Sequence, residues 1–381
     1  MTDRHLARTP TAPLGAIVSE VTALAPQRRL ADPQLVAATA RAWSANTIRA
    51  FLSDLKLWDA WCRRSGVRTA TADAEAVAAY VRALSGQDLG SKAGRATPPR
   101  AAATIARYLV HIGWAYRMAG REDPTAAPLV RLEHKAARKL LGTKQCQAPA
   151  IRFKGDVTDL DAPASGICLS SLLKATRRDM LGARDRALLL VAYDTGCRRS
   201  ELVAIRVDDV EGPDADGSGA LTIPRSTTDR EQQGAIAYFS PAAMLAIEAW
   251  REAAHVASGA LFRRVDTYFD GSVRSAGEQA LHPNTITLIY KRLIRAAFER
   301  KLLGPMSEKE VDRWIAAVSG HSIRVGVAQD NFAAGENLPA IMQAYRWRDA
   351  KTVMRYGAKL AAKSGASARL ARRFSGDASR G

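Results

Sequence analysis

The sequence predicts a mainly α-helical protein of two domains, the second of which carries a small antiparallel sheet. Three observations predict this fold class. The chain has 381 residues, more than one ordinary domain needs. Hydrophobic residues make up 47% of it, the level of a globular protein. Apolar residues recur at three- and four-residue steps along most of the chain, and the strand pattern is confined to one short stretch.

Composition and periodicity divide the chain into four parts. Residues 1–30 are rich in Pro, Thr and Arg, and we expect a flexible tail there. Residues 31–142 carry amphipathic patterns and are expected to form a helical domain. Residues 143–164 lose the helical periodicity and are expected to link this domain to the second one, residues 165–381.

The first domain is predicted from successive amphipathic runs. The first run starts after Ser44, where Ser44 or Asn46 can serve as the N-cap. Two further runs follow, and Gly120 is the stop signal of the second of them. The basic stretch Val130–Lys144 is a candidate fourth helix. The apolar positions of the first three runs are Ile48, Phe51, Leu55, Trp58, Val77, Tyr80, Val81, Leu84, Ile105, Tyr108, Leu109 and Ile112.

The second domain mixes helices with one predicted β-hairpin. Helical patterns resume at Leu169 and again over Asp185–Tyr193. Two strand-like segments, Ala220–Arg225 and Ala235–Phe239, then flank a polar loop and predict an antiparallel pair. From Pro241 onward the pattern is mostly helical to the end.

The charge of the chain indicates the kind of partner. The formal net charge is +18 and the isoelectric point is near 10.1, which favours a polyanion. No apolar run approaches the roughly 20 residues that span a bilayer, so no membrane partner is expected. The N-terminus lacks the apolar stretch of a secretory signal, and we expect a cytoplasmic protein. The four cysteines form no C-x-x-C pair, which argues against a zinc site or a disulfide framework.

The candidate site residues occur in the second half of the chain, in the segments Thr195–Leu202 and His321–Arg324, followed by Trp347 and Tyr356. A phosphodiester under nucleophilic attack gains negative charge, and the planar fork of arginine suits that charge. Arg324 follows His321 by three residues, so a helix would present both on one face.

We expect two further residues of the first segment to support the geometry of the site. Glu201 follows Arg198 by three residues and is placed to orient the Arg198 side chain. Gly196 allows the backbone a tight entry to the helix that carries both of them.

These motifs resemble those of the tyrosine recombinases, the phage-integrase family. The resemblance covers about residues 40–375. It implies a SAM-like helical core-binding domain and an α+β catalytic domain of the DNA breaking-rejoining type with a C-terminal docking helix. The segments that carry it are T-G-x-R-x-S-E-L at Thr195–Leu202, S-G-H-S-x-R-V-G-x-A-x-D at Ser319–Asp330, I-M-Q-A at Ile341–Ala344, G-or-R-W at Arg346–Trp347, V-M-x-Y at Val353–Tyr356, S-x-x-T-x-[KR] at Ser44–Arg49 and W-x-A-W-C at Trp58–Cys62.

The resemblance also implies roles for the matched residues. Tyr356 would attack the phosphorus, form a 3′-phosphotyrosine and release a 5′-hydroxyl. Arg198 and Arg324 would hold the phosphate. His321 would act in proton transfer, Trp347 would donate its indole N–H to a phosphate oxygen, and Glu201 would be the acidic support residue. The ester conserves the energy of the broken bond, so neither a metal ion nor another cofactor is expected.

One position departs from the pattern of the family. The hairpin loop reads Arg225-Ser226-Thr227-Thr228-Asp229, so Thr227 stands where the family usually has a lysine that protonates the leaving 5′-oxygen. A threonine hydroxyl is a poor acid. Either Arg225, Arg230 or His321 acting through water assists the leaving group, or strand cleavage is slow.

The resemblance further implies a clamp of both domains around double-stranded DNA, a palindromic target site and a homotetramer on two such sites. Leu370 and Phe374 fit a face that docks on a neighbouring protomer, and equally a face packed on their own domain. Six positions would meet the groove or the phosphates, although each also fits an ordinary solvated helix face. They are Thr47, Arg49, Ser53, Lys56, Thr104 and Arg107.

Three functions are consistent with these residues. The first is a site-specific recombinase that acts through a covalent tyrosine intermediate. The second is a catalytically impaired DNA-binding accessory protein on the same scaffold, which Thr227 favours. The third is an enzyme like the type IB topoisomerases, which the match in the N-terminal domain disfavours.

Overall fold

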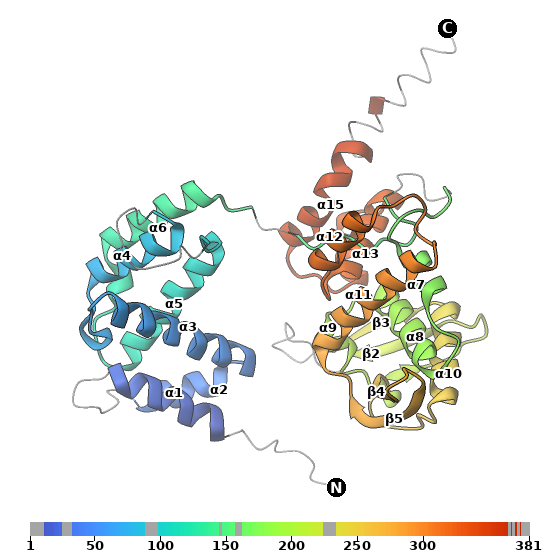
Figure 1. Ribbon diagram of the computed structural model, residues 1–381, viewed down its shortest axis with the longest axis horizontal. Helices are drawn as coiled ribbons and strands as arrows, with labels where there is room; N and C mark the ends of the chain where they lie inside the picture. The colour runs from blue at the N-terminus through green and yellow to red at the C-terminus, as the bar shows by residue number, and fades with distance from the viewer. Residues whose placement is uncertain are drawn as a thin grey trace. The chain divides into compact units, whose positions relative to one another are not determined.

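The computed structural model describes residues 11–24, 33–87, 98–144, 147–156, 162–223 and 234–364, together with residues 367, 370, 371 and 374. The chain divides into two compact units, Met1–Cys146 and Gln147–Gly381 (Figure 1). The first unit is helical, and the second combines helices with small antiparallel sheets. The predicted fold class is therefore confirmed.

The helices of the first unit pack around one apolar core. Ser44 caps α3, because its hydroxyl accepts a hydrogen bond of 3.1 Å from the Thr47 amide. The apolar stripe of α3 then buries Phe51 and Trp58 against Ile105 of α5. The helices of the unit are α1 (Thr11–Leu24), α2 (Pro33–Ala42), α3 (Ala45–Arg64), α4 (Ala74–Ser85), α5 (Ala102–Met118) and α6 (Pro128–Leu141).

Helix α1 corrects the expectation of a flexible tail over residues 1–30. Residues 11–24 of that stretch are helical, and Ile17 and Val21 are fully buried in the core of the first unit. These two residues lie one helical turn apart, so both reach the same apolar surface. The high content of Pro and Thr concealed this short apolar face in the sequence.

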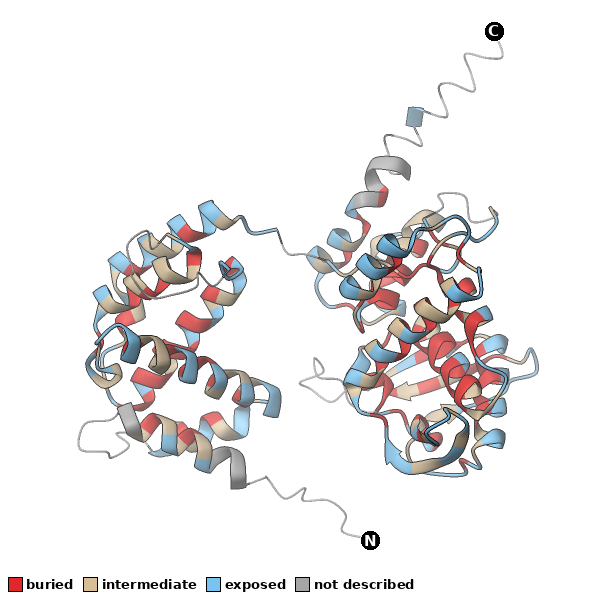
Figure 2. Ribbon diagram, viewed as in Figure 1, coloured by how far each residue is buried: buried red, intermediate tan, exposed pale blue. Residues whose placement is uncertain are grey.

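The second unit begins with buried helices and continues into two small sheets. Figure 2 shows buried residues through the interior of this unit. Its elements are α7 (Leu169–Ala175), α8 (Met180–Thr195), α9 (Arg199–Leu202), β1 (Val210–Glu211), β2 (Gly219–Ile223), β3 (Ala235–Phe239), α10 (Pro241–Ala253), β4 (Arg263–Thr267), β5 (Val273–Ala280), α11 (Pro283–Glu299), α12 (Glu308–Ala317), α13 (Ser322–Ala334), α14 (Leu338–Ala344) and α15 (Ala350–Ser364).

The predicted hairpin is present as β2 and β3. The two strands pair antiparallel with Leu221 opposite Ala237, and both of these side chains face the core. β1 adds a third strand on the other side of β2. A second sheet, made of β4 and β5, was not predicted, because β5 is mostly exposed and lacks a buried alternating face.

A segment of the expected linker packs into the second unit. The amide of Ile151 donates to the carbonyl of Ser322 at 2.9 Å, and a methyl group at Gly326 would lie 1.9 Å from the Ile151 carbonyl oxygen. The buried guanidinium of Arg152 donates to Asp330 at 2.6 Å, and the hydroxyl of Tyr193 donates to the same carboxylate at 2.7 Å. These contacts fix α13, which carries Arg324.

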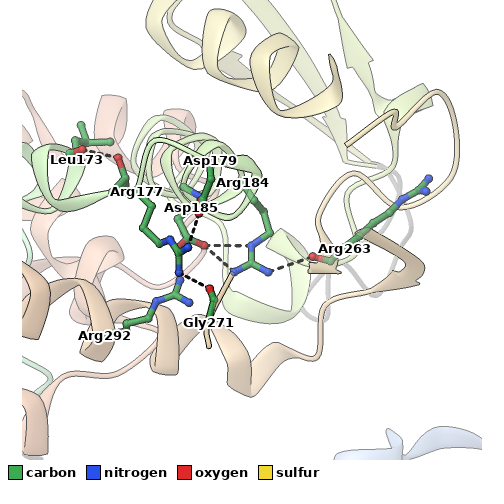
Figure 3. Close-up of polar contacts among 10 residues, drawn as sticks. Leu173, Arg177, Asp179, Arg184, Asp185, Arg263, Gly271 and Arg292 are labelled. Carbon is green, nitrogen blue, oxygen red and sulfur yellow. Dashed lines mark hydrogen bonds and ion pairs between the residues drawn. The ribbon is translucent and has the colours of Figure 1, made fainter. Parts of the chain in front are cut away.

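A buried ion network fixes α8 to the rest of the unit (Figure 3). Asp185 of α8 accepts hydrogen bonds from the Arg184 guanidinium, at 3.1 Å from Nε and 2.8 Å from Nη2, and from Arg292 of α11. Arg184 Nη1 also donates to the carbonyl of Arg263 in β4 at 3.4 Å. The Arg184 and Asp185 side chains are 4% and 3% exposed, so water cannot replace these partners.

Asp185→Asn is expected to lower the free energy of unfolding by about 3–5 kcal/mol, because it leaves the buried Arg184 guanidinium without its counter-charge. Urea denaturation measures this loss. The matched control is Asp266→Asn, which breaks the exposed pair of Asp266 with Arg264 and should cost less than about 1 kcal/mol. Equal losses in the two variants would contradict a structural role for the buried network.

Candidate active site

The turn after α8 positions the first of the candidate arginines. α8 ends at Thr195 and its C-cap is Gly196, whose φ of 55° is left-handed; a Cβ there would lie 2.8 Å from Cδ1 of Tyr345. Arg198 then caps α9. Its amide and its Nη1 donate to the two carboxylate oxygens of Glu201 at 2.9 and 2.8 Å. The contact expected between these two side chains is therefore present, and Glu201 fixes the direction of Arg198.

Arg324 reaches the same turn from α13. Its guanidinium donates to the carbonyl oxygens of Gly196 and Tyr345, the latter at 3.5 Å, and its Cζ lies 4.6 Å from the centroid of the Trp347 ring. Burial lowers the pKa of Arg324 to about 10, and the positive charge of Arg198 adds to this effect. The two candidate arginines, 126 positions apart in the sequence, are thus close enough to repel each other.

His321 lies beside both arginines, at the N-terminal end of α13. Its amide donates to the Ser319 hydroxyl at 3.2 Å, and its side chain stays accessible at the surface. Partial desolvation lowers the pKa of His321 below 6.5, and the charges of Arg324, Arg199 and Arg198 lower it further, while Glu201 opposes them. The imidazole is therefore neutral at pH 7 and can accept a proton.

Trp347, in the loop between α14 and α15, and Tyr356, on α15, complete the site. Trp347 belongs to a small core with Val353 of α15, and the ring of Tyr356 packs against this core. The Trp347 and Tyr356 rings meet edge to face at 6.1 Å. None of the residues that the structure describes accepts a hydrogen bond from the buried Trp347 Nε1. This donor is available for an acceptor that a ligand would bring.

The structure thus brings Arg198, His321, Arg324, Trp347 and Tyr356 together, with Glu201 behind them. Two cations and an unpartnered indole N–H suit a bound anion. Thr227 lies outside the described residues. In the part of the chain that the structure describes, no group of three or more His, Cys, Asp or Glu side chains could hold a metal ion.

Sequence reasoning did not predict the role of one further residue of the site. Arg346, directly before Trp347, donates to the carbonyl of Thr195 and to Sγ of Cys197, both at 3.3 Å, and approaches Glu201 to 3.9 Å. Arg346 belongs to the G-or-R-W element of the resemblance, but residue spacing assigned it no role in the site. Its position beside Trp347 was the signal that could have marked it.

The candidate DNA contacts of the first unit lie on α3 and α5. Arg49, Ser53 and Lys56 are exposed and follow one another at four and three residues, so they share one face of α3. Arg107 of α5 is about half exposed and donates to both carboxylate oxygens of Asp54 on α3, at 2.9 and 3.0 Å. This ion pair ties α5 to α3. The remaining two positions, Thr47 on α3 and Thr104 on α5, are partly buried.

In the described part of the chain, no helix has the length and apolar character that crossing a membrane requires.

Comparisons with known proteins give a consistent result. The profile of the phage integrase family matches residues 168–363. The recombinase Cre of Escherichia phage P1 is 29% identical over 335 residues, which are 87% of this chain and 89% of Cre. An integrase/recombinase XerD homologue of Selenomonas ruminantium is 26% identical over 319 residues, 82% of this chain and 81% of the relative.

Two solved structures have a similar fold. The XerH site-specific recombinase, bound to a palindromic difH substrate, superposes with a TM-score of 0.54 at 14% identity, over 93% of this chain and 95% of XerH. The Tn1549 transposon integrase, in complex with transposon right-end DNA, superposes with a TM-score of 0.51 at 13% identity, over 89% of this chain and 98% of the integrase chain in that structure.

Proposed function

This chain belongs to the phage integrase family and is a tyrosine-type site-specific DNA recombinase, and we propose that Tyr356 is the nucleophile with which it cleaves and rejoins DNA. The Tyr356 oxygen attacks the scissile phosphorus, a 3′-phosphotyrosine forms, and the bond to the 5′-oxygen breaks. A 5′-hydroxyl of the partner strand then attacks the phosphorus of the phosphotyrosine, a new phosphodiester forms, and the bond to the Tyr356 oxygen breaks. The convergence of Arg198, Arg324, Trp347 and Tyr356 is the observation that carries this proposal.

The surrounding donors stabilise the charge that develops on the phosphate. Arg198 and Arg324 hold the non-bridging oxygens, since a guanidinium offers paired N–H groups and keeps its charge at neutral pH. The unpartnered Nε1 of Trp347 donates to one of the same oxygens. Because the donors are fixed before DNA binds, little reorganisation is needed in the transition state.

We assign the removal of the Tyr356 proton to His321. A phenol with an ordinary pKa of about 10 is mostly protonated at pH 7, so attack requires a base. Desolvation and the adjacent arginines keep the His321 imidazole neutral there.

The rate of cleavage is therefore expected to fall only below a pH of about 6.5, since the pKa of His321 is lowered and protonation removes the base. Single-turnover cleavage rates measured from pH 5 to pH 8 give the acid limb of the pH–rate profile, in which this fall would appear. In His321→Gln the rate should be lower at every pH and the acid limb absent. An unchanged acid limb in that variant would assign the titration to another group.

The leaving 5′-oxygen also needs a proton, and Thr227 is a poor donor. A DNA substrate with a 5′-bridging sulfur is expected to cleave at least about tenfold faster than the oxygen substrate, because a thiolate leaves without protonation. The measurement is a single-turnover comparison of the two oligonucleotides. Equal rates would show that another group, such as Arg225, Arg230 or His321 through water, already supplies the proton.

We further propose a Cre-like assembly, a homotetramer on two palindromic sites. The palindromic substrate of XerH and the similarity to Cre support this proposal. Leu370 and Phe374 are 53% and 64% exposed in the single chain, so packing on their own unit does not account for them. Contacts to each DNA site come from both units, with Arg49, Lys56 and Arg107 among those of the first unit.

One assay separates the three candidate functions. The protein is incubated with a nicked suicide oligonucleotide that carries its target site, and covalent protein–DNA adducts are resolved under denaturing conditions. A site-dependent adduct supports the recombinase, and stable binding without any adduct supports the accessory protein that Thr227 suggests. Relaxation of a supercoiled plasmid that lacks the site would instead support the topoisomerase.

A further inference from the structure

Arg346 has an unusual backbone for an arginine. Its φ of 57° lies in the left-handed region, which favours glycine and tolerates asparagine but which other side chains rarely adopt. Such strain persists only where surrounding contacts hold it in place. The contacts that Arg346 makes are therefore expected to matter.

The side chain of Arg346 folds back onto the turn between α8 and α9. Its Nη2 donates to the carbonyl of Thr195, 151 residues earlier in the chain, and to Sγ of Cys197, both at 3.3 Å. The same nitrogen lies 3.9 Å from the Glu201 carboxylate, which also orients Arg198. The Arg346 side chain is only 15% exposed, so its contacts lie mainly within the second unit.

Arg346 thus links the two segments that carry the proposed chemistry. Trp347 follows it directly, and the loop between α14 and α15 leads into the helix that carries Tyr356. Tyr345, directly before it, packs on Gly196 of the same turn. Arg324 donates to Gly196 and Tyr345 across this junction, and the hydrogen bonds of Arg346 also join loop and turn.

We propose that Arg346 is a positioning residue for strand cleavage: it docks the loop between α14 and α15 on the Thr195–Cys197 turn and so sets Trp347 and Tyr356 against the phosphate-binding arginines. This inference rests on the proposed function. A direct contact of Arg346 with the DNA phosphate is the competing arrangement, since its buried Nη1 has no hydrogen-bond partner among the described residues. DNA affinity distinguishes the two, because a lost phosphate contact weakens binding and a lost docking contact slows cleavage.

The test uses two substitutions with opposite properties. Arg346→Asn suits the left-handed backbone but removes the guanidinium. Arg346→Lys keeps the charge and the unfavourable backbone preference, and one ammonium group can retain part of the contact with Thr195 and Glu201. Arg313→Asn, on the exposed face of α12, is the control for losing one positive charge.

The first readout is hydrogen–deuterium exchange of the full-length protein without DNA. In Arg346→Asn, amides of residues 345–356 are expected to exchange about tenfold faster than in the parent, while those of α8 and α10 keep their rates. In Arg346→Lys the increase should be smaller. Unchanged exchange in Arg346→Asn would overturn the docking role whatever the catalytic outcome.

The second readout is single-turnover cleavage of the suicide oligonucleotide at saturating DNA. Arg346→Asn should cleave about 10- to 100-fold more slowly than the parent, Arg346→Lys should recover part of this loss, and Arg313→Asn should match the parent. DNA affinity should stay within about twofold in all three. Parental rates in Arg346→Asn, or a tenfold loss of its DNA affinity, would overturn the proposal. If the parent itself formed no adduct, the proposed function would be refuted instead. The exchange experiment would still test the docking role of Arg346, because it requires neither DNA nor cleavage.

Discussion

Tyr356→Phe is expected to abolish the covalent protein–DNA adduct and to lower strand cleavage by at least about 10⁴-fold, because it removes the nucleophilic oxygen itself. The phenyl ring keeps the edge-to-face contact with Trp347 and the packing on the core around Val353. Folding and DNA affinity should therefore match those of the parent. The measurement is the yield of adduct with the suicide oligonucleotide, beside a binding titration on the same DNA.

Tyr345→Phe is the matched control for this experiment. Tyr345 also lies in the site, with its ring centroid 5.5 Å from that of Trp347, but its hydroxyl accepts a hydrogen bond of 3.2 Å from Asn331. Burial raises the pKa of Tyr345, which makes its phenolate less accessible. This variant should still form the adduct. If Tyr345→Phe lost the adduct while Tyr356→Phe kept it, the nucleophile would be Tyr345 and our proposal for Tyr356 would be wrong.

Local sequence signals predicted most of the helices and the first hairpin. The apolar stripe of α3 and its cap at Ser44 follow from residue spacing alone, as does the alternation in β2 and β3. The hairpin of β4 and β5 escaped prediction because Val265 is the one buried residue of its strands, so no alternating face marks it. Helix α1 escaped because only Ile17 and Val21 of its described side chains are buried.

Within the site, residue spacing could predict only the contacts between residues that are close together in the sequence. The spacing of Arg198 and Glu201 predicts their contact, since i, i+3 neighbours meet on any helical turn. The approach of Arg324 to Gly196 depends on how α13 packs, and only the resemblance to a known family indicated it. Arg346 could not be found from spacing, because its side chain reaches Cys197 from a left-handed backbone that no local signal in the sequence requires.

The second large effect is expected for Arg324→Lys, which keeps the charge and changes only its shape. The Arg324 guanidinium donates to Gly196 and Tyr345, and its Cζ lies 4.6 Å from the centroid of the Trp347 ring. An ammonium group cannot make these contacts and still present two donors to a phosphate. Strand cleavage should therefore fall by about 10²- to 10³-fold, a loss comparable to removing one charge-stabilising donor.

Single-turnover cleavage at saturating DNA measures this loss, and a titration shows whether binding is retained. Arg313→Lys on exposed α12 is the matched control, since the same substitution there removes no buried contact and should leave the rate unchanged. Thermal melting of both variants separates a catalytic loss from unfolding of the second unit. Cleavage by folded Arg324→Lys within about threefold of the parent would mean that charge alone suffices at this position, and that the paired geometry of the guanidinium contributes little to transition-state stabilisation.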